Sequence, residues 1–359
     1  MPATTSEAFG KRVCYKGDWR RQSLKMIDSM PIAGQIGDLR GRGKFEASGI
    51  AARNHHYYVV FDGQESFGYL NSGMQFRDPD SQLIGHVGDD SQYESITYRQ
   101  RTDTFFATVE AAPVPQEAAD RKLRSRGLAE GDKLYRPVFH EVKIDPHKGE
   151  AEVLRVCETD FDVRSSNKGF EAMEYIETPS GGVFVALCEG NNCQGADHPG
   201  HGELVFLVED TAAEDFDGCL FKTVKTLPVP EVAKFLDYSA MSFYPLSINP
   251  KMGDRESLGR LAIASQENAA LWVGDFDVDA LEFVGEGVTL HFPRDHDCNI
   301  RHCNIEGVLW VDDYRIVTVS DRAKEHQPFW CEATDQTLSM FMLPHHYWKG
   351  PGLAETDED

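Results

Sequence analysis

The chain has 359 residues, of which 41% are hydrophobic and 26% are charged, and its formal net charge is −23. This length and composition are those of an ordinary globular protein with ample material for a core. The strong negative charge disfavours nucleic acids and anionic membranes as partners, because both require a concentrated basic surface. A small anionic molecule bound by a local cation is still allowed, and the sequence predicts no oligomeric state.

The start of the chain has no basic segment followed by an apolar one, so the sequence predicts no signal peptide. No run approaches the ~20 apolar residues that a membrane helix requires. Both observations favour a cytoplasmic protein. The mature form of a secreted protein would have the same features, so that alternative stays open.

Eight cysteines are scattered along the chain, and their spacing is neither a dense disulfide framework nor a CxxC pair. We therefore expect free thiols. The spacing leaves the state of two close pairs open, namely Cys188 with Cys193 and Cys298 with Cys303.

A two-part pattern recurs five times. Each copy opens with an aromatic or aliphatic residue, an acid (once a serine), a small residue and an apolar run, near residues 46, 94, 171, 239 and 306. After a turn, a second apolar run ends in an acid, at Asp62, Glu110, Glu189, Glu267 and Asp321. The last copy, 304–321, has two runs of β-branched and aromatic residues around an Asp-Asp turn, which predicts a β-hairpin.

The segments between copies have room for two further strands each, except after the last copy, which has room for one. The unassigned N-terminal segment 23–30 would supply the missing strand and close a ring. The sequence thus predicts an all-β fold, a five-bladed β-propeller with four-stranded antiparallel blades. A six-bladed propeller with one degenerate blade is the alternative.

No low-complexity linker divides the chain, so we expect a single domain over residues 1–354. The charged segment 115–132 predicts a helical insertion on the surface. The acidic tail 355–359 is typical of a disordered end.

The repeated acids predict a site at one rim of the channel. The first strand of each blade lines the channel, so its opening residue should point toward the axis, and these residues are Glu46, Glu94, Glu171, Ser239 and Glu306. Clustered carboxylates repel one another and require protons, basic partners or a cation. We expect Ca²⁺ as the metal, because it accepts ~6 to 8 oxygen ligands in flexible geometry. The alternative is that the glutamates accept hydrogen bonds from backbone amides between blades.

A second ring of residues would supply the chemistry. Glu189 or Glu267 is the candidate general base, and Asp321 ends the equivalent strand of the last copy. Arg322 and Lys324 follow that strand and would stabilise developing negative charge.

The loop 291–304 enters the same rim. Its Arg294, Arg301 and His302 are candidates for binding an anionic substrate, and the alternative is that these cations balance the acidic rim. A zinc site from His296, Cys298, His302 and Cys303 matches no strong spacing signature and is disfavoured.

The segments Phe170-Glu171-Ala172-Met173 and Asn304-Ile305-Glu306-Gly307-Val308 resemble the blade openings of phytase-like and SdiA-regulated propellers. The five copies with their Glu/Ser ring are also similar to the calcium-activated nucleotidases, or apyrases. The resemblance spans roughly residues 45–343. It implies a calcium-dependent hydrolase that acts on phosphate esters or anhydrides.

Three hypotheses follow. The leading one is a metal-dependent hydrolase that acts on a small anionic substrate at the channel rim. The second is a propeller without enzymatic activity that binds a ligand or a protein around a structural calcium. A glycosidase is less favoured, because the acids of the ring look equivalent and glycoside cleavage needs one acid and one base in different environments.

Overall fold

The computed structural model describes residues 21–38, 45–64, 66–85, 92–115, 133–163, 169–178, 181–188, 190, 202–211, 219–246, 257–322 and 327–347. The fold is all-β, as predicted, and the described part contains twenty strands. Its helical segments are short: α2 (Ile32–Ile36), η2 (Glu231–Ala233), η3 (Phe329–Ala333) and η4 (His345–Tyr347). No helix of the described residues is long and apolar enough to cross a membrane.

Three sheets have four strands each, paired antiparallel with their neighbours. The first has the order β2 (Ala47–Arg53), β3 (His56–Phe61), β4 (Phe67–Asn71), β5 (Gln82–Ile84). The second has the order β14 (Ala240–Pro245), β15 (Leu258–Ser265), β16 (Ala270–Asp277), β17 (Glu282–His291).

The third sheet joins the two ends of the described chain. Its order is β1 (Lys25–Pro31), β20 (Thr337–Met342), β19 (Arg315–Ser320), β18 (Ile305–Asp312). The N-terminal β1 pairs antiparallel with β20, from Lys25 opposite Met342 to Pro31 opposite Thr337. The strand from the start of the chain therefore completes a sheet built by its end, in the place that the sequence analysis gave to segment 23–30.

The remaining eight strands form one sheet made of two antiparallel halves. One half is β6 (Tyr93–Arg99), β7 (Thr104–Pro113), β8 (Tyr135–Asp145) and β9 (Glu150–Thr159). The other half is β10 (Phe170–Thr178), β11 (Gly181–Cys188), β12 (Glu203–Glu209) and β13 (Cys219–Pro228). The halves meet where β13 pairs parallel with β9 over three residues, starting at Cys219 opposite Cys157.

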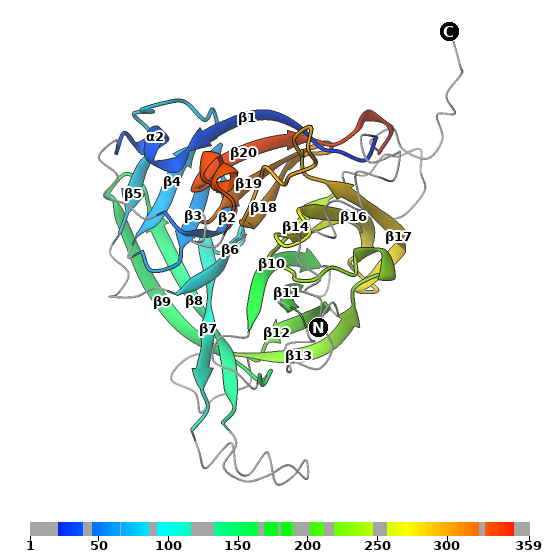
Figure 1. The fold of residues 1–359 in the computed structure, drawn as a ribbon. Helices are drawn as coiled ribbons and strands as arrows, with labels where there is room; N and C mark the ends of the chain where they lie inside the picture. Colours follow the sequence, from blue (N-terminus) through cyan, green and yellow to red (C-terminus); the bar gives the residue numbers. More distant parts are fainter. Residues whose placement is uncertain are drawn as a thin grey trace.

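The sheets stand around a common centre (Figure 1). The five strands that open the sheets or half-sheets, β2, β6, β10, β14 and β18, contact one another in a closed cycle, so we call them the inner strands. Five hydrophobic clusters of described residues fill the spaces between neighbouring sheets or half-sheets. One of them packs Tyr58 of β3 against Phe105 of β7 and Val142 of β8. This radial arrangement is that of a β-propeller.

Small residues set how closely the inner strands approach. A Cβ atom on Gly49 of β2 would lie 2.8 Å from the Cα of Ser95 on β6. A Cβ atom on Gly307 of β18 would lie 3.3 Å from the Cα of Gly49. The contact between β2 and β6 therefore requires glycine at position 49, and the contact between β18 and β2 strongly favours it at 307.

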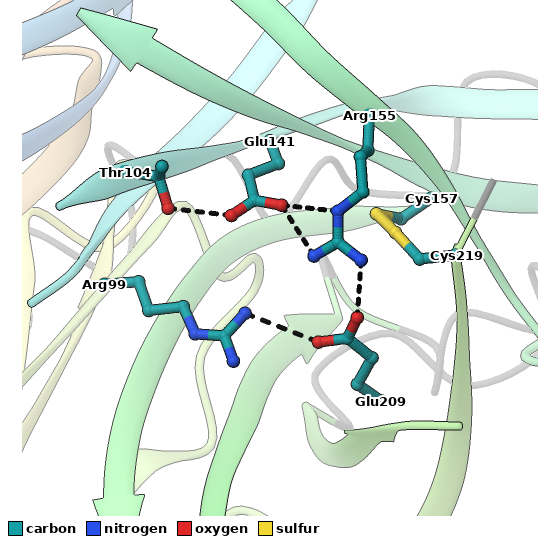
Figure 2. Close-up of a disulfide and its surroundings, with 7 residues drawn as sticks. All are labelled: Arg99, Thr104, Glu141, Arg155, Cys157, Glu209 and Cys219. Carbon is teal, nitrogen blue, oxygen red and sulfur yellow. Dashed lines mark hydrogen bonds and ion pairs between the residues drawn. A yellow bond between two sulfur atoms is a disulfide. The ribbon is translucent and has the colours of Figure 1, made fainter. Parts of the chain in front are cut away.

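Two cross-links hold the halves of the large sheet together (Figure 2). The first is a disulfide between Cys157 of β9 and Cys219 of β13. The second is a chain of ion pairs and hydrogen bonds beside it. In this chain Glu141 (4% exposed) pairs with Arg155 at 2.6 Å, and Arg155 pairs with Glu209 of the other half at 2.6 Å. Because these ion pairs cross from β8 and β9 to β12, they fix one half of the large sheet against the other.

The same ion pairs and hydrogen bonds extend to β6 and β7. Glu209 also pairs with Arg99 of β6 at 3.3 Å, and the hydroxyl of Thr104 donates to Glu141 at 2.8 Å. The buried Glu141 thus has both oxygens occupied, which is the condition under which a buried charge is tolerated.

The expectation of free thiols was wrong. Besides Cys157–Cys219, Cys303 is bonded to Cys331, and Cys188 and Cys298 are disulfide-bonded as well. Cys303 therefore does not pair with Cys298. The bonded cysteines lie 62 and 28 residues apart in sequence and meet only through the fold, so their spacing carried no signal. Disulfides persist in oxidising compartments, and the cytoplasmic expectation loses its support.

Two features predicted from the sequence lie outside the described residues. These are the helical insertion 115–132, of which only Pro115 is described, and the acidic tail 355–359.

The Cys157–Cys219 disulfide should contribute strongly to stability, because it closes a loop of 62 residues and links two outer strands. We expect the variant with both cysteines changed to serine to lose about 2–4 kcal/mol of unfolding free energy, measured by urea denaturation. The matched control replaces Thr223 on β13 by serine, which keeps a hydroxyl to donate to Asp160 and should leave the midpoint unchanged. A double serine variant with the wild-type midpoint would show that the bond adds nothing.

Candidate functional site

The inner strands β6, β10 and β18 each have a β-bulge at the same place, and each bulge contains a glutamate. On β6, Tyr93 pairs with Val109 and Ser95 with Thr108, so Glu94 is the extra residue of the bulge. Glu171 of β10 and Glu306 of β18 occupy the equivalent positions. A bulge redirects the side chain of its extra residue. The three glutamates therefore leave their strands in the same way and at the same end of the inner ring.

On β2 the bulge falls at Ser48, because Ala47 pairs with Phe61 and Gly49 with Val60. The predicted equivalent, Glu46, lies two residues earlier. Its carbonyl accepts from the amide of Asp62 at 2.7 Å, as the carbonyl of Asn304 accepts from Asp321 at 2.9 Å. The strand register thus aligns Glu46 with Asn304 and Ser48 with Glu306.

Ser239 lies just before β14, beside the start of β18. It is 4% exposed, its amide donates to the carbonyl of Ala264, and its hydroxyl donates to the carbonyl of Ile305 at 2.7 Å. Its side chain therefore links two inner strands.

The fit of the rim to calcium is poor as the side chains lie. Within the described ranges, no three His, Cys, Asp or Glu side chains are grouped so that they could hold a metal ion. Glu94, Glu171 and Glu306 are half-buried, and each of them already has an interaction partner. No catalytic step through a metal is therefore derived from this arrangement.

Two acidic residues lie at the same end of the hairpin β18–β19. Ile305 pairs with Ser320, so the next residue of β18, Glu306, and the residue after β19, Asp321, lie at the same end. A side-chain oxygen of Asp321 accepts from the amide of Arg322. The Arg322 guanidinium lies 3.6 Å from Glu46, and its side chain is 42% exposed. This corner of the rim thus combines two acids with a solvent-accessible cation.

The other predicted catalytic residues have different positions. Glu267 is exposed, and its amide donates to a carboxylate oxygen of Asp237 at 3.1 Å. Glu189 and Lys324 lie outside the described residues.

Of the three residues predicted to bind substrate, Arg301 is exposed while Arg294 and His302 are buried. Arg294 donates to the carbonyl of Cys298 at 3.3 Å and to that of Asn268 at 3.1 Å, so it holds the loop 291–304 to the turn after β15. Burial lowers the pKa of Arg294 to about 10, which leaves it charged at neutral pH.

His302 is 2% exposed and packs edge-on against Phe341, with ring centroids 4.8 Å apart. Burial, assisted by the charge of Arg301, lowers the pKa of His302 to about 4. The imidazole is therefore neutral at physiological pH and acts as part of the packing between the loop and β20.

Asp237 is a half-buried residue with a buried carboxylate oxygen, and sequence reasoning missed it. Burial raises the pKa of its carboxyl to about 6, although the hydroxyl of Ser265 and the amide of Glu267 both donate to it. Its second oxygen is buried and has no hydrogen-bond partner among the described residues. Asp237 precedes the fourth inner strand, as Asn304 precedes the fifth. Gln92 also has a polar side chain at this position but Gly169 has none, so the position alone did not identify Asp237.

Glu174 is a second missed acid, in the middle of β10. It accepts from the amide of Phe243 on β14 at 3.1 Å and from the hydroxyl of Thr97 on β6 at 3.1 Å. Burial raises its pKa to about 7, while the donors, which include Ser242, act in the opposite direction. One carboxyl therefore joins three inner strands. Nothing in the sequence distinguishes Glu174 from Glu171 and Glu177 on the same strand.

No family model and no curated protein matches this sequence. Solved structures are similar at low scores. The hydrazine synthase of Kuenenia stuttgartiensis is 9% identical with a TM-score of 0.36, over 79% of this chain and 58% of its own. A GH43_1 enzyme from Xanthomonas citri complexed with xylotriose is 8% identical with a TM-score of 0.42, over 93% and 92%. The Dos1 propeller is 8% identical with a TM-score of 0.33, over 84% and 71%. These scores support no functional conclusion.

Glu174 should make stability depend on pH. Its pKa is raised from 4.5 to about 7 in the folded protein, so between these values the folded state holds a proton that the unfolded state has lost. Unfolding free energy should therefore fall as pH rises through this window, by roughly 3 kcal/mol in total. In Glu174→Gln this component should be absent, which is tested by urea denaturation of both proteins from pH 4.5 to 8. Parallel curves for the two proteins would contradict the assignment.

Proposed function

We propose that the chain is a five-bladed β-propeller. The three four-stranded sheets are three of the blades, and the two halves of the eight-stranded sheet are the other two, joined along their outer strands. The closed cycle of five inner strands and the pairing of β1 with β20 support this count over six.

We further propose that the protein is a hydrolase that acts on a small anionic substrate at the bulged rim of the inner ring. The observation that carries the proposal is the repeated bulge, which directs Glu94, Glu171 and Glu306 from the same end of their strands. Bulges of this kind recur next to active sites, where they redirect a side chain.

The corner formed by Glu306, Asp321 and Arg322 carries the chemistry in this proposal. In this proposal one of the two acids accepts a proton from the attacking water as the general base. The half-exposed guanidinium of Arg322 binds the anionic group of the substrate and stabilises the negative charge that develops on it.

The proposed substrate is a phosphate ester or anhydride, in line with the resemblance of the blade openings to phytase-like propellers and calcium-activated nucleotidases. A bidentate arginine is well suited to a phosphoryl group. Arg301, exposed on the neighbouring loop, would add a second cation at the same rim.

Calcium binding at the rim is the second part of the proposal, from Glu46, Glu94, Glu171, Ser239 and Glu306. It requires these side chains to give up their present partners, such as Arg322 for Glu46 and Ile305 for Ser239. A third part is an oxidising compartment for the protein, which the disulfides support.

Replacing Glu306 by glutamine tests the assignment of the site. We expect the hydrolysis of 4-nitrophenyl phosphate and pyrophosphate to fall in kcat by ~10²-fold or more, because a general base contributes that much. Glu286→Gln, on the exposed part of β17, is the matched control and should retain the wild-type rate. If the wild type hydrolyses neither compound, or if Glu306→Gln keeps its full rate, the proposed activity at this rim is wrong.

Calcium is tested separately by thermal unfolding. Demetallated protein should gain melting temperature as CaCl₂ is added, because a ligand bound only by the folded state stabilises it. MgCl₂ should have a smaller effect, since Mg²⁺ requires a tighter octahedral site. Equal melting temperatures with and without calcium would remove the metal and leave the carboxylate proposal to stand on the rate measurements.

A further inference from the structure

A cleft of ≈ 430 Å³ opens on the face opposite the bulged rim. It lies between the sheet β2–β5 and the half-sheet β6–β9. Three hairpin turns surround it, at residues 54–55, 100–103 and 146–149, and each follows the end of a strand that runs away from the rim. Its volume is within the usual range of small-molecule sites, ~300 to 1,000 Å³.

One wall of the cleft is aromatic. The rings of His56 and Tyr69 are stacked, with centroids 4.2 Å apart and planes 11° apart, and Tyr58 meets Tyr69 edge-on at 5.3 Å. His56 is held in place by a hydrogen bond of 3.0 Å between its Nδ1 and the carbonyl of Asn54. Burial raises the pKa of Tyr58 to about 12, so its phenol stays neutral. The wall is thus a fixed surface on which a planar ring can pack.

The acids of the cleft are already neutralised. Asp103 pairs with Arg53 at 2.7 Å and accepts from the hydroxyl of Tyr98 at 2.7 Å. Asp145 pairs with Lys148 at 3.1 Å and also accepts from backbone amides of its own turn. Neither carboxylate therefore contributes an uncompensated negative charge.

Lys143 is a cation of the cleft that takes part in neither of these two ion pairs. It lines the cleft from β8 with an exposed side chain. None of the ion pairs found among the described residues includes it. In a protein of net charge −23, a cleft with paired acids and an unpaired lysine is a local site for an anion.

We propose that this cleft binds a small planar organic anion, with its ring against Tyr69 and His56, whose position the buried Tyr58 helps to fix, and its negative group at Lys143. The site is separate from the proposed hydrolytic rim, because the two lie at opposite ends of the inner strands. It would serve either as a subsite for a ligand other than the hydrolysed substrate or as a regulatory site.

The probe for the experiment is 4-hydroxybenzoate, titrated into the full chain and followed by ligand-observed NMR. We expect saturable binding. The neutral isostere 4-hydroxybenzamide and the ringless anion acetate should each bind at least ~10-fold more weakly, because each lacks one of the two contacts.

Variants place the binding in the cleft. Lys143→Met keeps the apolar stem and removes the charge, and it should weaken 4-hydroxybenzoate binding ~10-fold or more. Lys25→Met, which removes an exposed charge from β1 in another sheet, is the matched control and should bind as the wild type does. Glu306→Gln should also bind normally, which separates this site from the hydrolytic rim. The melting temperature of each variant shows that it is folded.

The proposal is overturned if the wild type shows no saturable binding of 4-hydroxybenzoate. It is overturned as well if a folded Lys143→Met binds as tightly as Lys25→Met, or if the neutral amide binds as well as the carboxylate. Loss of 4-hydroxybenzoate binding in Glu306→Gln would show that the anion binds at the rim, and it would also overturn the proposal.

Discussion

The structure depends on how the inner strands satisfy their backbone amides. Each inner strand is the free edge of its sheet, and unpaired amides at an edge are costly when they are buried. Here side chains of the neighbouring strand accept from them: Ser95 and Thr97 of β6 accept from Met173 and Tyr175 of β10 at 3.0 Å each. Glu174 of β10 accepts from Phe243 of β14, and Ser242 of β14 accepts from Trp310 of β18 at 3.2 Å. Among the described residues, polar side chains thus join β6 to β10, β10 to β14 and β14 to β18, while glycines allow close approach between β18 and β2 and between β2 and β6.

The outer strands face a different constraint, because they are edges as well and lie farther from one another. Elsewhere on the perimeter single hydrogen bonds link them: the amide of Leu24 donates to the carbonyl of His291 at 2.8 Å, and the amide of Gly85 donates to that of Gly149 at 3.1 Å. The outer strands β9 and β13 pair directly with each other, and the disulfide Cys157–Cys219 joins them. The ion pairs Glu141–Arg155 and Arg155–Glu209 lie beside this disulfide. Ion pairs that are buried only in part contribute little by themselves. Together with a covalent bond, they give this pair of half-sheets a fixed relative position that the other sheets obtain from apolar packing and inner-strand contacts.

The all-β fold could be predicted because the pattern of the β18–β19 hairpin recurs along the sequence. The segment that forms β1 belongs to no copy of this pattern, so it could be assigned to the missing strand. It could not give the register of β2. Glu46-Ala47 and Ser48-Gly49 both satisfy the rule of a polar residue before a small one, and only strand pairing shows that the bulge falls at Ser48. The disulfides join residues that no spacing relates. Asp237 and Glu174 were missed because a carboxyl buried by tertiary contacts looks in sequence like any other acid, and the burial that raises its pKa comes from other strands.

The same constraint decides where function can lie. Along their middle the inner strands have little freedom, since Gly49 touches Ser95 and the amides of the next strand need an acceptor of fixed length. The two ends are free of this requirement. At one end bulges redirect Glu94, Glu171 and Glu306, and at the other Tyr98 and Tyr175 hold the guanidiniums of Arg53 and Arg99 over their rings, at 5.7 and 5.2 Å. An acidic end and an aromatic end therefore follow from one rigid centre, and ligands of different chemistry are expected at each.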